Sequence, residues 1–161
     1  MKINKKLKFP WSVKWTERAI EAAKFIPADT SVIDLGGGQG EFYKQLKGKC
    51  YYLALDTKPW TEFTQVCDFN KDELPNFPPF QFIVLLGTLE YIEKSAEFLA
   101  KIKKYGDKMI MSYRESSNGG MDRKNNLKYE EVEKMLGDSG WEILAKKRIT
   151  NGDRLYYCNR K

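Results

Sequence analysis

The stretch VIDLGGGQGEF, from Val32 to Phe42, constrains the fold of this chain more than any other feature. It holds the end of a short apolar run, an acid at Asp34, four glycines and a helix-compatible segment from Glu41. The glycines are Gly36, Gly37, Gly38 and Gly40. Glycine lets the backbone turn sharply and lie close to a ligand, and the N-terminal amides of the next helix point at the same place. The stretch predicts a buried strand, a ligand-binding turn and a helix; a tight turn without a ligand is the alternative.

The spacing of the glycines shows which known type of nucleotide-binding loop the sequence matches. The dinucleotide pattern GxGxxG accepts Gly36 and Gly38, but its third position falls on Glu41. The phosphate loop of nucleotide hydrolases is excluded, because no Gly-Lys-Ser/Thr follows. The pattern that the sequence does satisfy is Asp34-x-Gly36-x-Gly38-x-Gly40.

Acids also follow the next two predicted strands. The apolar run 50–55 ends at Asp56, which lies 22 residues after Asp34. A carboxylate at this point can accept hydrogen bonds from both hydroxyls of a ribose. A short strand over 66–68 ends in Asp68, for which an Asx turn before Asn70 is the alternative interpretation. Because parallel strands end at one edge of a sheet, we expect these three carboxylates to converge.

The order of the predicted elements indicates an α/β fold. Helices are expected from Ser12, over 41–47, from Ser95 and over 128–139, and strands over 31–35, 50–55, 66–68, 81–86 and 107–113. The run 81–86 is the most apolar, which is typical of a central parallel strand. Asn151-Gly152 predicts a hairpin between 140–144 and 155–158. We therefore expect a Rossmann-like, mostly parallel sheet with helices on both faces and a C-terminal antiparallel hairpin, formed by one domain over 11–161 after a basic arm at 1–10.

Composition narrows the classes of protein. The chain is 42% apolar and 14% aromatic, which is globular, and it has no run long enough for a membrane span. It has three widely spaced cysteines and no histidine, so neither a disulfide framework nor a metal site is expected, and a cytoplasmic location is the default. The net charge of +6 is concentrated in 1–10 and 141–161. Such ends can attract nucleic acid, an anionic membrane or a phosphorylated substrate, although a solvated surface is the simpler interpretation.

Several of these features together carry a resemblance to a known family. They are the Asp34 glycine motif, Asp56, Asp68, the stretch Gly-Thr-Leu-Glu-Tyr-Ile at 87–92 and the closing hairpin. From Thr30 onward the chain resembles the class I S-adenosylmethionine-dependent methyltransferases, which implies a seven-stranded sheet and S-adenosylmethionine as cofactor. The short second crossover and Cys-Asp-Phe-Asn-Lys at 67–71 make it similar, more narrowly, to small bacterial methyltransferase-like domains linked to polysaccharide biosynthesis.

The resemblance also implies a set of cofactor-binding residues. Asp34 would lie near the methionyl amino group, and Asp68 would bind the adenine amino group beside the backbone amide of Phe69. The complete expected set is Asp34, Gly36, Gly37, Gly38, Gly40, Asp56, Thr57, Asp68, Phe69, Leu86 and Gly87. In this family a helix before the glycine motif often covers the cofactor, so Trp11 and Trp15 are candidates for a lid; packing on the sheet is the alternative.

Methyl transfer from a sulfonium is an in-line displacement that depends mostly on positioning. A base is needed only when the acceptor loses a proton, and the chain has no histidine for that role. We predict Glu90 as the base, with Tyr91 beside it; in the alternative, Glu90 only bonds a backbone amide or caps a helix. The long polar segment 114–126 is expected to be the substrate loop. The predicted substrate residues are Tyr113, Arg114 and Arg123. The two arginines could bind an anionic group on the acceptor, although solvated loop charges are the simpler interpretation of each.

Three functions remain compatible with the sequence. The first is methyl transfer to a small or glycan-linked hydroxyl acceptor. The second is a cofactor-binding domain that works through a partner, suggested by the missing histidine and the short second crossover. The third is an RNA methyltransferase that uses the basic ends. It is less favoured, because the sequence has neither an Arg-rich patch interleaved with aromatics nor an Asn/Asp-Pro-Pro-Tyr motif.

Overall fold

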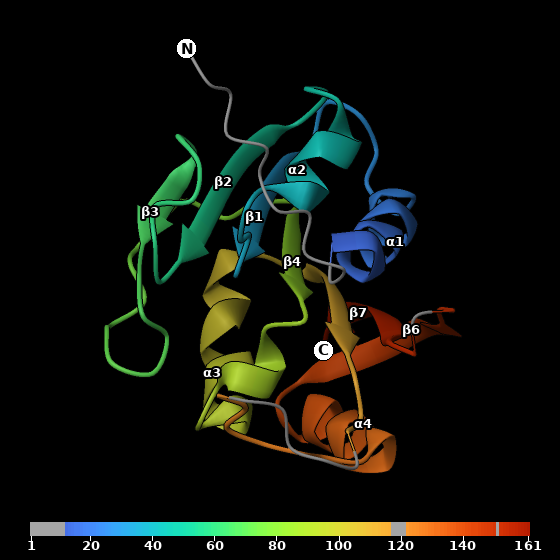
Figure 1. The fold of residues 1–161 in the computed structure, drawn as a ribbon. Helices are drawn as coiled ribbons and strands as arrows, with labels where there is room; N and C mark the ends of the chain where they lie inside the picture. The colour runs from blue at the N-terminus through green and yellow to red at the C-terminus, as the bar shows by residue number, and fades with distance from the viewer. Residues whose placement is uncertain (1–11, 117–121, 151) are drawn as a thin grey trace, which may run out of the picture.

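Seven strands form one mixed sheet in the order β3-β2-β1-β4-β5-β7-β6 in the computed structural model, which describes residues 12–116, 122–150 and 152–161 (Figure 1). The strands are β1 (Ser31–Leu35), β2 (Tyr51–Asp56), β3 (Thr64–Val66), β4 (Phe82–Leu86), β5 (Lys108–Tyr113), β6 (Trp141–Arg148) and β7 (Arg154–Arg160). The helices are α1 (Ser12–Ala23), α2 (Glu41–Leu46), α3 (Ser95–Lys101) and α4 (Tyr129–Asp138), with 3₁₀ turns η1 (Leu89–Tyr91) and η2 (Ile102–Tyr105).

The sheet has one point at which the direction of winding reverses. Strand β1 pairs in parallel with both β2 and β4, and the chain continues to β3 on one side and to β5 on the other. Strand β7 pairs antiparallel with β5 and with β6, which closes the sheet with a hairpin. In open α/β sheets, ligands bind outside the carboxyl ends of the strands at such a reversal. The predicted fold class, with its terminal antiparallel hairpin, is confirmed.

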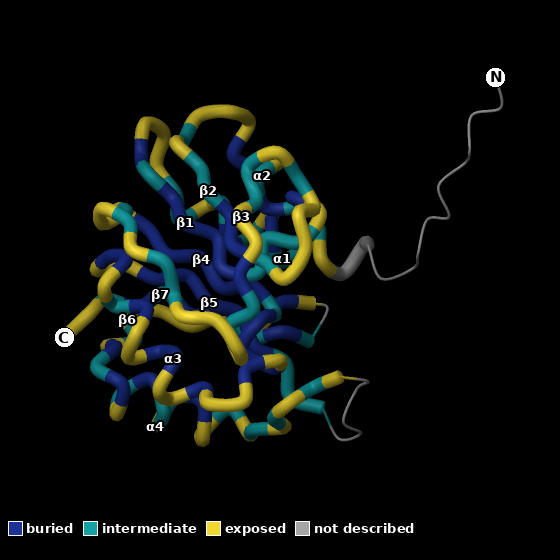
Figure 2. The backbone as a smooth tube through the Cα atoms, turned by 90° about the vertical axis from the view of Figure 1, so that its left-hand side faces the viewer, coloured by how far each residue is buried: buried dark blue, intermediate teal, exposed yellow. Residues whose placement is uncertain are grey.

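Helices cover both faces of the sheet, because the central strands are apolar on both sides. Every residue of β4 is buried. On one face, Ala22 of α1 and Phe42 of α2 pack against alternate residues of β1, β4 and β5. On the other face, Phe98 of α3 and Leu136 of α4 pack against the remaining residues of these strands. In Figure 2 the buried backbone runs as a continuous layer between the two sets of helices.

Some boundaries differ from those expected. Strand β3 ends at Val66, so Asp68 lies two residues beyond its tip rather than at it. The chain leaves the sheet here because the Asp68 carboxylate accepts a hydrogen bond from the Asn70 backbone N–H at 3.0 Å, which forms the Asx turn. Helix α1 buries a narrow face: Ala19 and Ala22 are buried, but Ile20 is exposed.

Two remaining expectations concern the N-terminal region and membrane-spanning helices. The basic arm at 1–10 and the side chain of Trp11 lie outside the described residues. Among the helices that are described, none combines the length and the apolar character needed to cross a membrane.

Candidate functional site

A cavity of about 680 Å³ lies at the carboxyl ends of the central strands. Its walls come from the glycine turn after β1, the ends of β2 and β4, the segments after β3 and β5, and helix α1. The sequence-predicted residues that line it are Asp34, Gly36, Gly37, Gly38, Asp56, Thr57, Asp68, Phe69, Leu86, Gly87, Glu90, Tyr91, Arg114 and Arg123. Gly40 and Tyr113 are not among the lining residues. The structure thus brings the three strand-end carboxylates to one site.

The glycine turn needs its glycines for two different reasons. Gly36 has φ +90°, and a Cβ there would lie 2.1 Å from the Thr88 hydroxyl oxygen, so the turn packs directly on the segment after β4. Gly38 has φ +52°, and a Cβ there would meet no atom within 4 Å. Close packing therefore explains Gly36, whereas Gly38 borders open space in the cavity and lets a ligand approach the backbone.

The Asp34 carboxyl is buried beneath the glycine turn. Its Oδ2 accepts a hydrogen bond from the Tyr52 hydroxyl at 2.6 Å. Burial raises the pKa of Asp34 to about 7; the Tyr52 hydrogen bond opposes this rise and the nearby Asp56 charge adds to it. Asp34 is therefore poised to become fully ionised when a cation binds beside it.

The Asp56 carboxylate organises the end of β2. Its Oδ2 accepts a hydrogen bond from the Gly38 backbone N–H at 2.9 Å. Its Oδ1 accepts from the Trp60 indole N–H and the Thr57 hydroxyl, both at 3.2 Å. The Asp56 carboxylate thus connects the glycine turn to the segment after β2. A polar ligand that binds there would share this carboxylate with the two loops.

Asp68 and Phe69 form the wall next to Asp56. The Asn70 backbone N–H, followed by Lys71, lowers the pKa of Asp68, which keeps its carboxylate ionised. The Phe69 ring packs on Phe98, with ring centroids 5.1 Å apart. The Asx turn at Asp68 is present, and the residue also lines the cavity.

Glu90 is the most unusual carboxyl of the site. It lies in η1 and is only 4% exposed. Its Oε1 accepts a hydrogen bond from the Arg114 backbone N–H at 3.0 Å, whereas Oε2 has no hydrogen-bond partner among the described residues. Burial raises the pKa of Glu90. Its neighbour Tyr91 is half exposed at the cavity wall.

Tyr113 plays a different part from the one expected. It is fully buried, and its hydroxyl donates to Asn125 at 2.8 Å while accepting from the Leu127 backbone N–H at 2.8 Å. Arg123 donates to the same hydroxyl at 3.2 Å and to the Arg114 carbonyl at 2.7 Å. Tyr113 and Arg123 therefore anchor the segment after β5, and Arg123 also borders the cavity.

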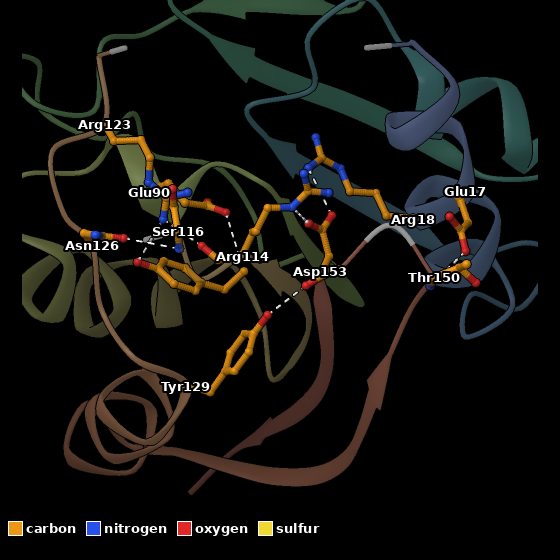
Figure 3. A network of polar contacts seen from close by, with 12 residues as sticks. Glu17, Arg18, Glu90, Arg114, Ser116, Arg123, Asn126, Tyr129, Thr150 and Asp153 are labelled. Atoms are coloured by element: carbon orange, nitrogen blue, oxygen red, sulfur yellow. Dashed lines mark hydrogen bonds and ion pairs between the residues drawn. The ribbon is translucent and has the colours of Figure 1, made fainter. Parts of the chain in front are cut away.

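Trp15, one of the two lid candidates, lines the cavity, whereas sequence reasoning did not assign its lining residues Arg18 and Asp153 to the site. Asp153 lies in the β6–β7 turn, and its carboxylate pairs with Arg114 Nε at 2.6 Å and Arg18 Nη1 at 3.4 Å (Figure 3). The Arg18 guanidinium also covers Gly87, where a Cβ would lie 2.2 Å from it. In the sequence, only the glycine at position 87 could have indicated this contact, because a residue without a side chain leaves room for a side chain from another segment.

Known structures resemble this chain in fold over nearly its whole length. A SAM dependent methyltransferase from Aquifex aeolicus matches with a TM-score of 0.73 and 17% identity, covering 98% of this chain and 96% of that one. A putative methyltransferase in complex with the Haloferax volcanii Trm112 methyltransferase activator gives 0.77 and 15%, covering 93% and 91%.

A third structure was solved with ligands. It is the Burkholderia thailandensis 1,6-didemethyltoxoflavin-N1-methyltransferase with bound 1,6-didemethyltoxoflavin and S-adenosylhomocysteine, with a TM-score of 0.71 and 17% identity over 94% of this chain and 80% of that one. No protein-family model matches the sequence, and no curated protein matches it significantly. Together with the strand order and the closing hairpin, these likenesses show that the chain has the class I methyltransferase fold.

Proposed function

We propose that this protein is an S-adenosylmethionine-dependent methyltransferase that acts on a hydroxyl group of a small molecule. The observation that carries the proposal is the convergence of Asp34, Asp56 and Asp68 with an open glycine turn on one cavity at the strand ends. This arrangement supplies carboxylates for a cation and for a ribose, and it supplies backbone that a ligand can approach closely.

The residues present fit this cofactor. The open space beside Gly38 gives the methionyl part a path along the backbone. Asp34 would bind the ammonium group, Asp56 the ribose hydroxyls, and Asp68 with the Phe69 amide the adenine. Thr57, Leu86 and Gly87 complete the same wall. When bound, S-adenosylmethionine would supply a methyl group on a sulfonium sulfur, and transfer exchanges its S–C bond for an O–C bond.

Glu90 supports a hydroxyl as the acceptor. A hydroxyl must lose its proton during methylation, and Oε2 of Glu90 is a buried acceptor atom at this cavity that has no hydrogen-bond partner among the described residues. A raised pKa brings a glutamate closer to the range in which a general base works at neutral pH. A glycan-linked hydroxyl belongs to the same chemistry and is one class of compound to be tried as an acceptor.

The basic C-terminal region gives little support to RNA as the substrate. Lys146 and Arg154 each pair with Glu133, Lys147 pairs with Glu21, and Arg160 pairs with Asp107. Cations that are already paired within the chain contribute less to a phosphate-binding surface than free cations do.

Cofactor binding tests the proposal directly. We expect S-adenosylhomocysteine to raise the melting temperature, since a ligand at 100 times its dissociation constant stabilises the folded state by about 2.7 kcal/mol. NADH, an alternative nucleotide for this kind of fold, should give no shift. Stabilisation by NADH and not by S-adenosylhomocysteine would refute the proposal. Cofactor binding without transfer to any hydroxyl compound would indicate a domain that needs a partner.

The buried Asp34 predicts a pH dependence of cofactor affinity. Its pKa in the folded protein is about 7, above its ordinary 3.8, so the folded protein holds an extra proton between these values and loses stability as the pH rises through them. A ligand ammonium next to Asp34 stabilises the ionised carboxylate and so reduces the free energy that is lost when the buried Asp34 ionises.

We therefore expect the affinity for S-adenosylhomocysteine to increase with pH, by at most about tenfold per pH unit, and to level off above about pH 7. Calorimetry in two buffers with different ionisation enthalpies should show proton release below that pH. In Tyr52→Phe, which loses the hydrogen bond that opposes the rise in pKa, the plateau should move to higher pH. An affinity that is flat from pH 5.5 to 8 would contradict the assignment.

A further inference from the structure

The charges that line the cavity are unevenly distributed. The acids Asp34, Asp56 and Asp68 lie at or just beyond the carboxyl ends of β1, β2 and β3, on the side of the sheet that the cofactor would occupy. The three cationic lining residues, Arg18, Arg114 and Arg123, come from α1 and from the segment after β5, on the other side of β4. The side that remains for the acceptor thus carries all three lining arginines, together with the buried acids Glu90 and Asp153.

Two of these arginines share a single carboxylate. Arg18 and Arg114 reach Asp153 from opposite directions, and the Asp153 side chain is only 2% exposed (Figure 3). A guanidinium carries five N–H donors, whereas the described contacts with Asp153 use Nη1 of Arg18 and Nε of Arg114. Each guanidinium therefore has further donors beyond the one that its described contact with Asp153 uses.

These arginines are not ordinary solvated surface charges. Their side chains are 16% and 32% exposed for Arg18 and Arg114, and both line the cavity. On this side of the cavity, Arg18, Arg114 and Arg123 supply three positive charges against two buried carboxyl groups, those of Asp153 and Glu90. Partly buried cations in excess of their counterions are stabilised by an anion, and a guanidinium binds a carboxylate through two parallel hydrogen bonds.

The basic group and the proton acceptor are joined by the backbone. The N–H of Arg114 holds Oε1 of Glu90, which leaves Oε2 of Glu90 without a partner among the described residues. A molecule whose anionic group meets the Arg114 guanidinium therefore lies close to the carboxyl that would take the hydroxyl proton. Asp153 is a positioning residue in this arrangement, because it orients both guanidiniums.

We infer that the acceptor carries a carboxylate near its reacting hydroxyl, and that Arg18 and Arg114, oriented by Asp153, bind this carboxylate. The inference rests on the proposed function for its reaction and specifies the class of acceptor. A monoanion matches the small excess of positive charge better than a phosphate dianion does. Trp15, Phe42 and Tyr91 also line the cavity and suit an aromatic body.

Binding of simple probes tests the inference without requiring the natural acceptor. The full chain, saturated with S-adenosylhomocysteine, would be titrated by NMR with benzoate, with its neutral analogue benzamide and with phenyl phosphate. We expect benzoate to bind at least tenfold more tightly than benzamide and more tightly than phenyl phosphate. Arg18→Gln and Arg114→Gln should each remove most of this preference.

Matched variants separate recognition from folding. Arg114→Lys should retain part of the preference because it keeps the charge, and Arg148→Gln, an exposed site on β6, should retain all of it. Equal binding of benzoate and benzamide, a preference that survives in both glutamine variants, or no binding of any probe would overturn the inference. Tighter binding of phenyl phosphate than of benzoate would also overturn the inference, because it would indicate an acceptor that carries a phosphate and not a carboxylate.

The same titration without S-adenosylhomocysteine keeps the two proposals distinguishable. An arginine-dependent preference for benzoate in a protein that does not bind S-adenosylhomocysteine would refute the methyltransferase function and leave an anion site. Cofactor binding without the preference would refute only the acidic acceptor.

Discussion

Replacing Glu90 with glutamine is expected to lower the rate of methyl transfer by about 10²- to 10⁴-fold, the usual contribution of a general base. Glutamine keeps an oxygen that can accept the Arg114 backbone N–H, so the segment after β5 stays in place. It cannot take a proton from the acceptor. The affinity for S-adenosylhomocysteine should change little, because Glu90 belongs to the acceptor half of the cavity.

The pH profile gives this prediction a second measurement. Burial raises the pKa of Glu90, so its base form is populated only above the ordinary glutamate range, and transfer should accelerate as the pH rises through that raised value. Glu90→Gln should lose this dependence, whereas Glu142→Gln, an exposed site on β6, should behave as the unmodified protein does. A Glu90→Gln variant within threefold of the original rate would show that positioning alone drives transfer.

Asp56→Ala is expected to abolish the thermal stabilisation by S-adenosylhomocysteine. The substitution removes the carboxylate predicted to bind the ribose and also releases the Gly38 N–H that it holds. A ligand that stabilises by about 2.7 kcal/mol at 100 times its dissociation constant would give almost no shift once its affinity falls by a factor of 100 or more. Differential scanning fluorimetry and calorimetry would measure both quantities.

Two further variants identify the cause of that loss. Asp56→Asn keeps the size of the side chain but removes its charge, and it should weaken binding less than alanine does. Asp138→Ala, at the exposed end of α4, should leave the shift unchanged. If Asp56→Ala binds S-adenosylhomocysteine within a factor of three of the original affinity, the ribose assignment fails.

The carboxylates that we propose for cofactor binding could be located from the sequence because they stand at or near strand ends. Asp34 and Asp56 each stand at or next to a strand end, and parallel pairing of β1 with β2 brings them to the same edge whatever the rest of the chain does. The pattern failed in detail at Asp68, where a side-chain hydrogen bond with the next turn outcompeted strand pairing and moved the residue beyond β3.

The acceptor half was not predictable, because its contacts join distant segments. Arg18 and Asp153 are 135 positions apart and meet only when α1 packs beside the β6–β7 turn. In the sequence Arg18 is one of several charged residues on a helix, and Asp153 is an ordinary turn residue after Asn-Gly. The contacts of Tyr113 could not be foreseen for a related reason: its hydroxyl bonds Asn125 and the Leu127 backbone, which come from the long segment after β5.

The tie between Arg18 and Asp153 has a consequence for the order of assembly during synthesis. Residues 31–69, which hold the three strand-end carboxylates, leave the ribosome early. The anion-binding wall cannot form until residue 153 has been made, because its carboxylate orients both guanidiniums. A nascent chain that stops before the final hairpin would therefore carry most of the groups that we propose for cofactor binding, but not the complete group that we propose for binding the acceptor.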